Sequence, residues 1–446
     1  MGRSRFPLST SQELALLGDR AVFAALERAL PAAVVRRTIV STHTRETRRW
    51  RLPAELVMTL VVALGLWSRE SVPAILEQLV EGLRARDPVR WLGWRAPVKS
   101  SLTEARQRLG ARPLRELFGR VARPLATPAT PGAFRFGLRL MAIDGTTLTL
   151  PDSPANARAF GRPTTKQGQG QWVTTQGAWP LMRVVLLVEC GTHAICDAIL
   201  RPYRASEVPS GQRLLRSVTE GMLLLADRGF YSAAFIQAVL ERGAHVLVRV
   251  RNGVNFPVEE RLADGSYCST IHPTWRTPRG APSGLRVRVI EYVLDDPGRP
   301  KRGEVYRVVT TLLDPTQAPA RELAATYHER WEHEGVNDEF KTHQNDRAPG
   351  PLVRSRRPAE VVQEVYGLLV AHWAIRALMV EAAAEAQIDP DRLSFVGALR
   401  VLRRAVPRFL QHADHPETTP FCSRPCATRS SRTAASPVGT ATIPVS

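Results

Sequence analysis

The 446-residue sequence lacks the features of a membrane or secreted protein. It begins MGRSRFPLST, without the apolar core of a signal peptide, and its longest apolar stretch, Leu56–Trp67, is too short to cross a bilayer. Cysteine is scarce, and the five cysteines show no regular framework spacing, which is typical of reduced thiols in a cytosolic protein. We therefore expect a cytoplasmic protein without a membrane partner.

Acidic residues are few relative to basic ones. There are 42 Asp and Glu against 61 Lys and Arg, which leaves a formal net charge of +19. The hydrophobic content of 44% and the charged content of 23% are otherwise typical of a soluble globular protein. The charge imbalance therefore favours a polyanionic partner.

The N-terminal part of the chain has a helical pattern. Apolar residues recur three and four positions apart from about Ser11 to Leu125, and the linker-like RPLATPATPGAF follows. The chain is longer than one ordinary core can use, so we expect two or three domains. The first of these is a helical N-terminal domain that covers residues 1–130.

After this linker the pattern changes to an α/β pattern. Strands are expected at Leu138–Leu150, Met182–Glu189, Ala194–Leu200, Met222–Ala226 and His245–Val250. Helices separate the last three of these strands, so the pattern predicts a mixed sheet with helices on its faces. The predicted regions are the first part of this core (131–250), a β-rich insertion subdomain (251–318), a helical remainder of the core (319–410) and a disordered tail (411–446).

Cys190, His193 and Cys196 are spaced as C-x-x-H-x-x-C, which resembles half a zinc site. They flank a Gly-Thr turn between two strand-like runs, and no second pair of ligands follows at a useful distance. We therefore do not expect bound zinc.

Two basic segments of the helical region are candidates for DNA contact. The first, VRRTIVSTHTRETRRWR, contains Arg45, Arg48 and Arg49 and a single acid, Glu46. The second, SSLTEARQRLGARPLRELFGRVARPL, has the length of a helix-turn-helix with Gly110 between two short helices. Each segment can also be an ordinary solvated or packed helix. The net charge of the chain favours DNA.

Two aspartates occur at strand ends. The run LMAIDGTTLTL places Asp144 in or at the edge of the first strand, and LLLADRGFYS places Asp227 just beyond the fourth. Carboxylates in such positions can converge across neighbouring strand ends. The alternative for each is structural, because Asp-Gly is a common hairpin turn and an Asp after a strand is a usual helix cap.

The segment YHERWEHEGVNDEFK carries a stripe of polar residues. Tyr327, Arg330, Glu334 and Lys341 recur at offsets of three, seven and fourteen, which confines them to an arc of roughly 60° at about 100° per residue. A solvated helix face with ordinary ion pairs is the alternative interpretation.

Taken together, DGT, LLLADRGF and Tyr-x-x-Arg-x-x-x-Glu-x-x-x-x-x-x-Lys resemble the signature of the insertion sequence 4 family of DDE transposases. The resemblance runs from about Leu14 to Arg404. It includes LALLGDRAVFAALERALP near the start and DPDRLSFVGALRVLRRAVPR near the end. It implies a ribonuclease H-like core interrupted by a β-rich insertion, in a bacterial enzyme of cut-and-paste DNA transposition.

By this resemblance, the catalytic and metal-binding residues are three acids, Asp144, Asp227 and Glu334. They would hold two Mg²⁺ ions, for which Mn²⁺ can substitute. Two hard cations need several carboxylate oxygens, and they stabilise the attacking and leaving oxygens of an in-line phosphoryl displacement.

The resemblance also assigns contacts with DNA. Tyr327, Arg330 and Lys341 would hold phosphates beside the metal pair. The partners would be the terminal inverted repeats and target DNA, bound by a homodimer in the nucleoid. For an aromatic that holds an extruded base, Tyr306, Trp275 and Trp331 are candidates only.

Three alternatives stay open at this point. The tail departs from the family pattern, so the chain can be a degenerate relative that binds DNA without transposing. A sequence-specific DNA-binding regulator would use the basic helices but would leave the polar stripe unexplained. Another two-metal nuclease with the same core fold would lack strand joining.

Overall fold

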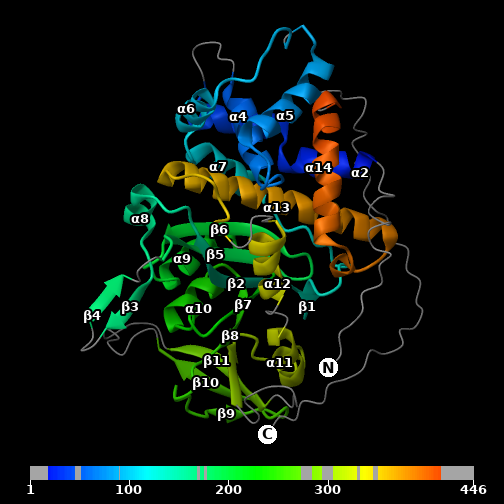
Figure 1. Ribbon diagram of the computed structural model, residues 1–446. Coiled ribbons are helices and arrows are strands. Elements are labelled where there is room, and N and C mark those ends of the chain that lie inside the picture. The colour runs from blue at the N-terminus through cyan, green and yellow to red at the C-terminus, as the bar shows by residue number, and fades with distance from the viewer. Residues whose placement is uncertain are drawn as a thin grey trace, which may run out of the picture.

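The computed structural model describes residues 19–45, 52–89, 91–167, 171–174, 178–272, 284–293, 305–328, 332–344 and 350–412. Helices from both ends of the chain gather at one end of the molecule, and a long sheet forms the rest (Figure 1). The long helix α13 (Pro358–Ala386) lies between these two parts.

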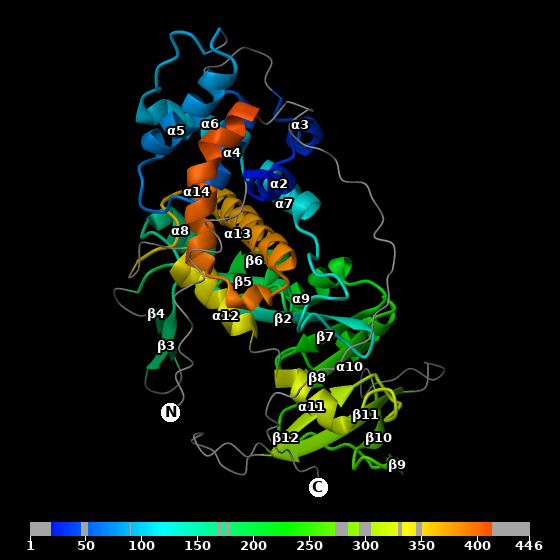
Figure 2. The same ribbon diagram turned by 90° about the vertical axis from the view of Figure 1, so that its right-hand side faces the viewer.

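The predicted helical N-terminal region is confirmed. Its described helices are α2 (Asp19–Ala29), α3 (Ala32–Ser41), α4 (Ala54–Leu64), α5 (Val72–Arg86), α6 (Lys99–Leu109) and α7 (Arg112–Val121). They bury their apolar residues against one another, against α13 and against α14 (Phe395–His412) in one continuous core with the sheet. Figure 2 shows α14 standing across α13 beside these helices. The N-terminal helices therefore share their core with the C-terminal ones.

The mixed sheet is also confirmed. Ten described strands form it, in the order β6 (Ala194–Pro202), β5 (Leu181–Glu189), β2 (Leu138–Thr149), β7 (Met222–Ala226), β8 (His245–Arg249), β12 (Val305–Thr310), β11 (Leu285–Val293), β10 (Tyr267–Ile271) and β9 (Glu260–Arg261), with β1 (Phe134–Arg135) beside β2. β2 pairs parallel with β7 and antiparallel with β5, and β7 pairs parallel with β8. The β-rich stretch expected as an insertion adds β9–β12 to the edge of this same sheet, through the pairing of β12 with β8.

Short helices follow the strands. They are α8 (Pro154–Phe160), α9 (Val208–Leu214), η1 (Leu215–Ser217), α10 (Ala233–Leu240), α11 (Ala320–His328) and α12 (Glu332–Asp338). A further short helix, η4 (Pro390–Arg392), lies between α13 and α14 and contacts α13. The two-stranded β3 (Thr164–Gln167) and β4 (Gln171–Thr174) stand apart from the main sheet.

The segment of the polar stripe, expected to keep one regular helical phase, contains a π-helical turn. Its described elements are α11 (Ala320–His328), α12 (Glu332–Asp338) and the π-helical turn η3 (Glu339–His343), which continues α12, while residues 329–331 lie outside the described residues. The backbone amide of Gln344 donates to the carbonyl of Glu339 at 2.8 Å, which closes this wider turn. A uniform step of about 100° per residue therefore does not hold through this segment.

The C-terminal boundary also differs slightly from the prediction. α14 includes Gln411 and His412, which the sequence pattern assigned to the tail. Residues 413–446, expected to be disordered, lie outside the described residues.

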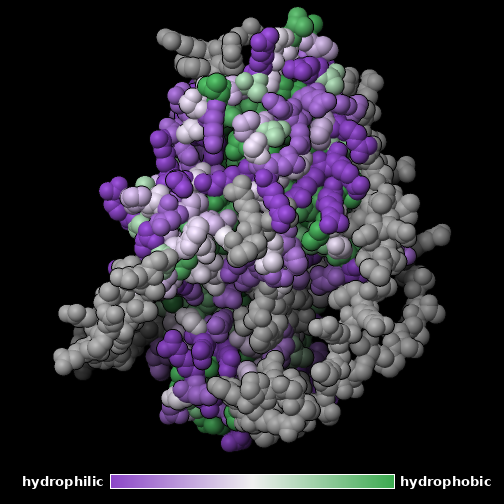
Figure 3. Space-filling model, in the orientation of Figure 1, coloured by the Kyte–Doolittle hydropathy of each residue, from purple (hydrophilic) through white to green (hydrophobic). Residues whose placement is uncertain are grey.

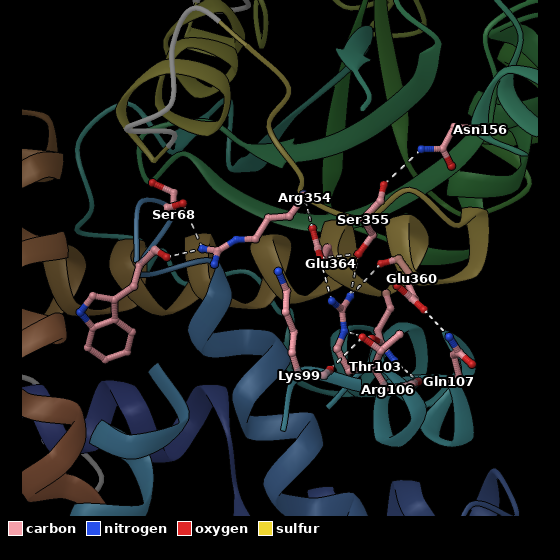
Figure 4. Close-up of polar contacts among 12 residues, drawn as sticks. Ser68, Lys99, Thr103, Arg106, Gln107, Asn156, Arg354, Ser355, Glu360 and Glu364 are labelled. Carbon is pink, nitrogen blue, oxygen red and sulfur yellow. Dashed lines mark hydrogen bonds and ion pairs between the residues drawn. The ribbon is translucent and has the colours of Figure 1, made fainter. Parts of the chain in front are cut away.

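Buried polar contacts join the helical end of the molecule to α13 (Figure 4). Arg106 of α6 forms an ion pair with Glu364 of α13 at 3.0 Å, and both side chains are nearly fully buried. Its guanidinium also donates to Gln363 Oε1 at 2.9 Å and to Ser355 Oγ at 3.1 Å. The other oxygen of Glu364 accepts the backbone N–H of Arg354 at 2.7 Å. An unpaired charge at this depth would be costly, so the contacts fix α6 against α13.

By length and composition, α13 is apolar enough to cross a membrane. However, 83% of its most apolar window is buried inside the fold, as expected for a core helix. Such a helix is weak evidence for a membrane span.

The packing of α14 on α5 predicts an asymmetry between two helical glycines. A Cβ at Gly82 would lie 2.3 Å from the backbone oxygen of Pro407, whereas a Cβ at Gly119 of α7 would meet nothing within 4 Å. Gly82→Ala should therefore lower the free energy of unfolding by about 1–3 kcal/mol through overpacking. Gly119→Ala should leave it unchanged or raise it by about 0.5–1 kcal/mol. Urea denaturation of both variants measures this, and equal effects would contradict the packing.

Candidate active site

Asp144 occupies the middle of the sheet, on β2. Its neighbours Ile143 and Gly145 face α9, since a Cβ at Gly211 of α9 would lie 3.3 Å from Ile143 Cδ1 and one at Gly145 would meet Glu207. Because side chains alternate along a strand, Asp144 points to the opposite face. Its Oδ1 accepts the backbone N–H of Gly145 at 2.7 Å, and the side chain is half-buried.

Asp227 lies beside Asp144. The parallel register pairs Ile143 with Ala226, so the two aspartates occupy the next position of neighbouring strands, which are spaced by about 5 Å. Asp227 Oδ1 accepts the backbone N–H of Arg228 at 2.5 Å, and the side chain is half-buried. The register therefore brings the backbones of the two residues close together, with Asp144 inside β2 and Asp227 just beyond β7, and the convergence of their carboxylates stays a prediction.

Lys341 of η3 is within electrostatic range of Asp144. Its side chain is half-buried, and burial lowers the pKa of its ammonium group while the negative charge of Asp144 acts in the opposite direction. The role of Lys341 at the acidic site stays a prediction. An ammonium group here can neutralise a phosphate oxygen next to the carboxylates.

For the third acid, Glu334, the structure describes the backbone only. Glu334 lies in α12, which packs against β2, but its side chain is outside the described part of the structure. Arg330, Arg48 and Arg49 also lie outside the described residues. Arg45, which follows α3, is described and is exposed.

Tyr327 of α11 is placed in the core. Its side chain is only 3% exposed and packs with Leu323 and Ala324 against the sheet strands. In this arrangement the ring does not share an open face with Lys341, because α11 contacts β8 and β11 whereas α12 contacts β2. Its contact with a DNA phosphate stays a prediction.

Of the aromatic candidates for an extruded base, only Tyr306 lies in the described residues, since Trp275 and Trp331 do not. Tyr306 stacks on Tyr292 with ring centroids 5.7 Å apart, and the guanidinium of Arg249 lies 4.3 Å from its ring centroid. The structure gives it a half-buried position in an aromatic group.

A buried carboxylate behind η3 was missed by the sequence analysis. Glu339 forms an ion pair with Arg376 of α13, whose Nε donates to Glu339 Oε2 at 2.9 Å. His193 Nδ1 lies 3.3 Å from Oε1, and His372 Nε2 lies 3.3 Å from Oε2. Asp391 of η4 completes the group, 3.7 Å from Arg376 and 3.6 Å from His193. The signal in the sequence was the polar pair His372 and Arg376, four residues apart within the apolar run of α13.

These contacts decide the charge of the group. Burial alone would raise the pKa of Glu339, but the charge of Arg376 and the hydrogen bonds from His193 and His372 outweigh it, and the pKa lies well below its ordinary value. Burial lowers the pKa of His372. Glu339 is therefore an anion at neutral pH, held between a cationic guanidinium and two imidazoles.

The C-x-x-H-x-x-C segment contributes to this group through one residue. His193 lies at the turn between β5 and β6 in the left-handed region, with φ 55°, and faces Glu339. The thiol of Cys196 donates to the backbone oxygen of Ala194 at 3.4 Å, and burial raises its pKa. The structure thus directs His193 towards a carboxylate.

The donors at the candidate site fit a hard cation. Asp144 in β2 and Asp227 just after β7 offer carboxylate oxygens, which suit Mg²⁺ better than a softer metal. Within the described residues no three or more His, Cys, Asp or Glu side chains are arranged around a metal position. The side chain of Glu334, the proposed third donor, is not among those residues.

Comparisons with known proteins agree with this geometry. A family model described as "Insertion element 4 transposase N-terminal" matches residues 20–119, and one described as "Transposase DDE domain" matches residues 135–374. The chain is 28% identical to "Transposase InsG for insertion sequence element IS4" from Escherichia coli K12, over 82% of this chain and 79% of that protein. It is 28% identical to "Putative transposase InsZ" from the same organism, over 48% of this chain and 67% of that protein. The chain therefore belongs to the insertion sequence 4 family of DDE transposases.

Proposed function

We propose that this transposase cleaves DNA at the inverted-repeat ends of an insertion sequence and joins those ends to target DNA. The observation that carries the proposal is the parallel register of β2 and β7, which places Asp144 and Asp227 at the next position of neighbouring strands, with Lys341 under the influence of the Asp144 charge. Adjacent carboxylates repel each other unless a cation lies between them. This arrangement is the one that a metal-dependent phosphoryl transfer needs.

Asp144, Asp227 and Glu334 would hold two Mg²⁺ ions, with Mn²⁺ as a substitute. When bound, the ions would supply charge stabilisation for the attacking and leaving oxygens of the phosphate. The backbone N–H groups of Gly145 and Arg228, each bonded to one carboxylate oxygen, orient the two aspartates. Lys341 would hold a phosphate of the cleaved strand beside them.

The remaining assignments concern DNA and assembly. Tyr327 and Arg330 would contact phosphates near the site, and Arg45, Arg48 and Arg49 would contact the inverted repeats. We further propose that two copies bring two ends together as a homodimer, in the bacterial cytoplasm. The charge of +19 supports DNA as the partner.

Two of the alternatives lose support. A DNA-binding regulator has no need for Asp144 and Asp227 to follow each other on neighbouring strands, nor for Lys341 near Asp144. A degenerate relative would be free to lose this arrangement, yet the described part of it is intact. A nuclease that cuts without joining differs only in its products.

The proposal predicts which acids are essential. Asp144→Asn, Asp227→Asn and Glu334→Gln should each abolish Mg²⁺-dependent nicking of a duplex that carries the element's own inverted repeat. The reason is that a lost carboxylate removes a metal ligand without removing a phosphate contact, so DNA affinity should change by less than about threefold. Nicking is measured on denaturing gels and binding by fluorescence anisotropy.

Matched controls separate this loss from a general effect. Asp152→Asn removes an exposed carboxylate whose only described role is an ion pair with Arg162, and it should leave nicking unchanged. Glu332→Gln changes an acid two residues before Glu334 and should keep substantial nicking. If Glu334→Gln nicks normally and Glu332→Gln does not nick, the assignment of Glu334 as the third acid is wrong.

A further inference from the structure

Helix α14 carries a row of arginines with no assigned role. Its apolar residues Phe395, Leu399, Leu402, Val406 and Phe409 are buried on one face. On the opposite face, Arg400, Arg404 and Arg408 recur every four residues and are exposed. At about 100° per residue this row is centred roughly 180° from the buried face.

The composition of α14 is strongly basic. The sequence FVGALRVLRRAVPRFLQH contains four arginines and no acidic residue. An exposed row of like charges on one face of a helix creates a positive potential along that face, which attracts a polyanion.

The helix that carries the row begins near the buried group around Glu339, behind the candidate active site. At the start of α14, Phe395 packs on His372, with ring centroids 5.5 Å apart, and beneath Arg376, which holds Glu339 of η3. At its end, Phe409 packs on Phe23 of α2 with ring centroids 5.9 Å apart. Figures 1 and 2 show α14 running from the level of α12 to the N-terminal helices. Hydrophilic side chains gather over it on the face drawn in Figure 3.

We propose that Arg400, Arg404 and Arg408 bind the phosphate backbone of duplex DNA whose end lies at the active site. This inference rests on the proposed function. The three guanidinium groups span about 12 Å of helix, and a duplex offers a phosphate charge for about every 1.7 Å of its axis. The planar guanidinium forks suit bidentate phosphate contacts. The row has no apolar side chain that would favour a protein partner instead.

The test compares two charge-matched variants of the full-length protein. The first is R400Q/R404Q/R408Q. The second, R158Q/R213Q/R242Q, removes the same charge from exposed arginines on α8, on α9 and after α10, away from α14. The probe is a fluorescein-labelled duplex of the element's inverted repeat together with its flanking DNA. Anisotropy titrations at several salt concentrations give the slope of log affinity against log salt.

The α14 variant should lower the magnitude of this slope by about 2 to 3, at roughly 0.9 for each lost phosphate contact, and the control variant by less than about 1. A slope unchanged from wild type, or equal losses in both variants, would overturn the proposal. So would a changed oligomeric state in light scattering with an unchanged slope, because the row would then bind a second copy. If the wild-type protein does not bind the duplex at all, the proposed function fails before the row is tested.

The buried group around Glu339 carries a second, independent inference. Replacing a buried ion pair by apolar residues is often neutral or stabilising, so stability does not explain why Glu339 and Arg376 are charged. The group lies where orientation matters, because Glu339 begins η3 and Lys341 follows two residues later. The other end of this turn is also held, since Gln344 Nε2 donates to the carbonyls of Gly65 at 3.1 Å and of Leu368 at 3.0 Å.

The same group contacts α12. A Cβ at Gly335, the residue after Glu334, would lie 3.3 Å from His193 Cε1, so His193 touches both α12 and Glu339. We infer that Glu339 is a positioning residue, which fixes α12 and η3 against the sheet so that Glu334 and Lys341 meet Asp144. This inference also rests on the proposed function.

Glu364 provides a matched control. It also forms a buried ion pair with an arginine, Arg106, but that pair joins α6 to α13 and not η3 to α13. Glu339→Gln should raise the Mg²⁺ concentration for half-maximal nicking by about tenfold or more, as changes behind a metal site commonly do. Glu364→Gln should lower the melting temperature comparably and leave the Mg²⁺ dependence unchanged. DNA affinity should be unchanged in both variants.

An unaltered Mg²⁺ dependence in Glu339→Gln, or an equal shift in Glu364→Gln, would refute the positioning role. If Glu339→Gln does not fold, Arg376→Lys takes its place, because it keeps the positive charge but loses the forked contact with both oxygens. An Arg376→Lys protein with wild-type Mg²⁺ dependence would refute the role equally. Absence of nicking in the wild-type protein would instead count against the proposed function.

Discussion

A charge buried in a protein interior has to meet an opposite charge, and α13 carries two charged side chains that obey this constraint. Glu364 pairs with Arg106 of the N-terminal helices, and about three turns later Arg376 pairs with Glu339 of the segment that bears Lys341. The first pair fixes the helical end of the molecule, and the second fixes the candidate active site. The helical end of the molecule and the candidate active site are therefore both anchored to the same helix, α13.

This common reference has a consequence for the proposed chemistry. α13 is largely buried along its length, so the N-terminal helices and η3 cannot shift relative to each other without breaking a buried ion pair. The N-terminal helices and the active site, which would bind the same DNA molecule, thus keep a fixed separation. A rigid connection of this kind suits an enzyme whose cut must fall at a set distance from a recognised sequence.

The sequence was sufficient to predict the parts that depend on local pattern. β7 was predicted with its observed bounds, and Asp227 follows it as expected, because a short apolar run ends where the buried strand ends. Asp144 lies inside β2, which continues beyond the end of β7 to Thr149. The mixed sheet and the helical N-terminal region followed from the same periodicities. These features need only neighbouring residues for their definition.

The parts that depend on distant residues could not be predicted in this way. Glu339 meets His193 across 146 positions, and no spacing rule connects them. His193 was instead grouped with Cys190 and Cys196, which are its neighbours in sequence. Similarly, one helical phase was carried through Glu339–His343, where a π-helical turn changes it. Tyr327 was placed on a polar stripe, whereas α11 buries it against the sheet.

Charges of one sign gather at two places on the surface of the fold. Asp144 and Asp227 follow each other in the register of neighbouring strands, and Arg400, Arg404 and Arg408 are exposed on one face of α14. In contrast, the buried side chains of Glu364 and Arg376 on α13 are paired with opposite charges. Opposite charges therefore pair inside the fold, whereas like charges gather where a partner can reach them. A divalent cation at the carboxylates and a phosphate backbone along the arginines would satisfy both, which is the combination that DNA transposition requires.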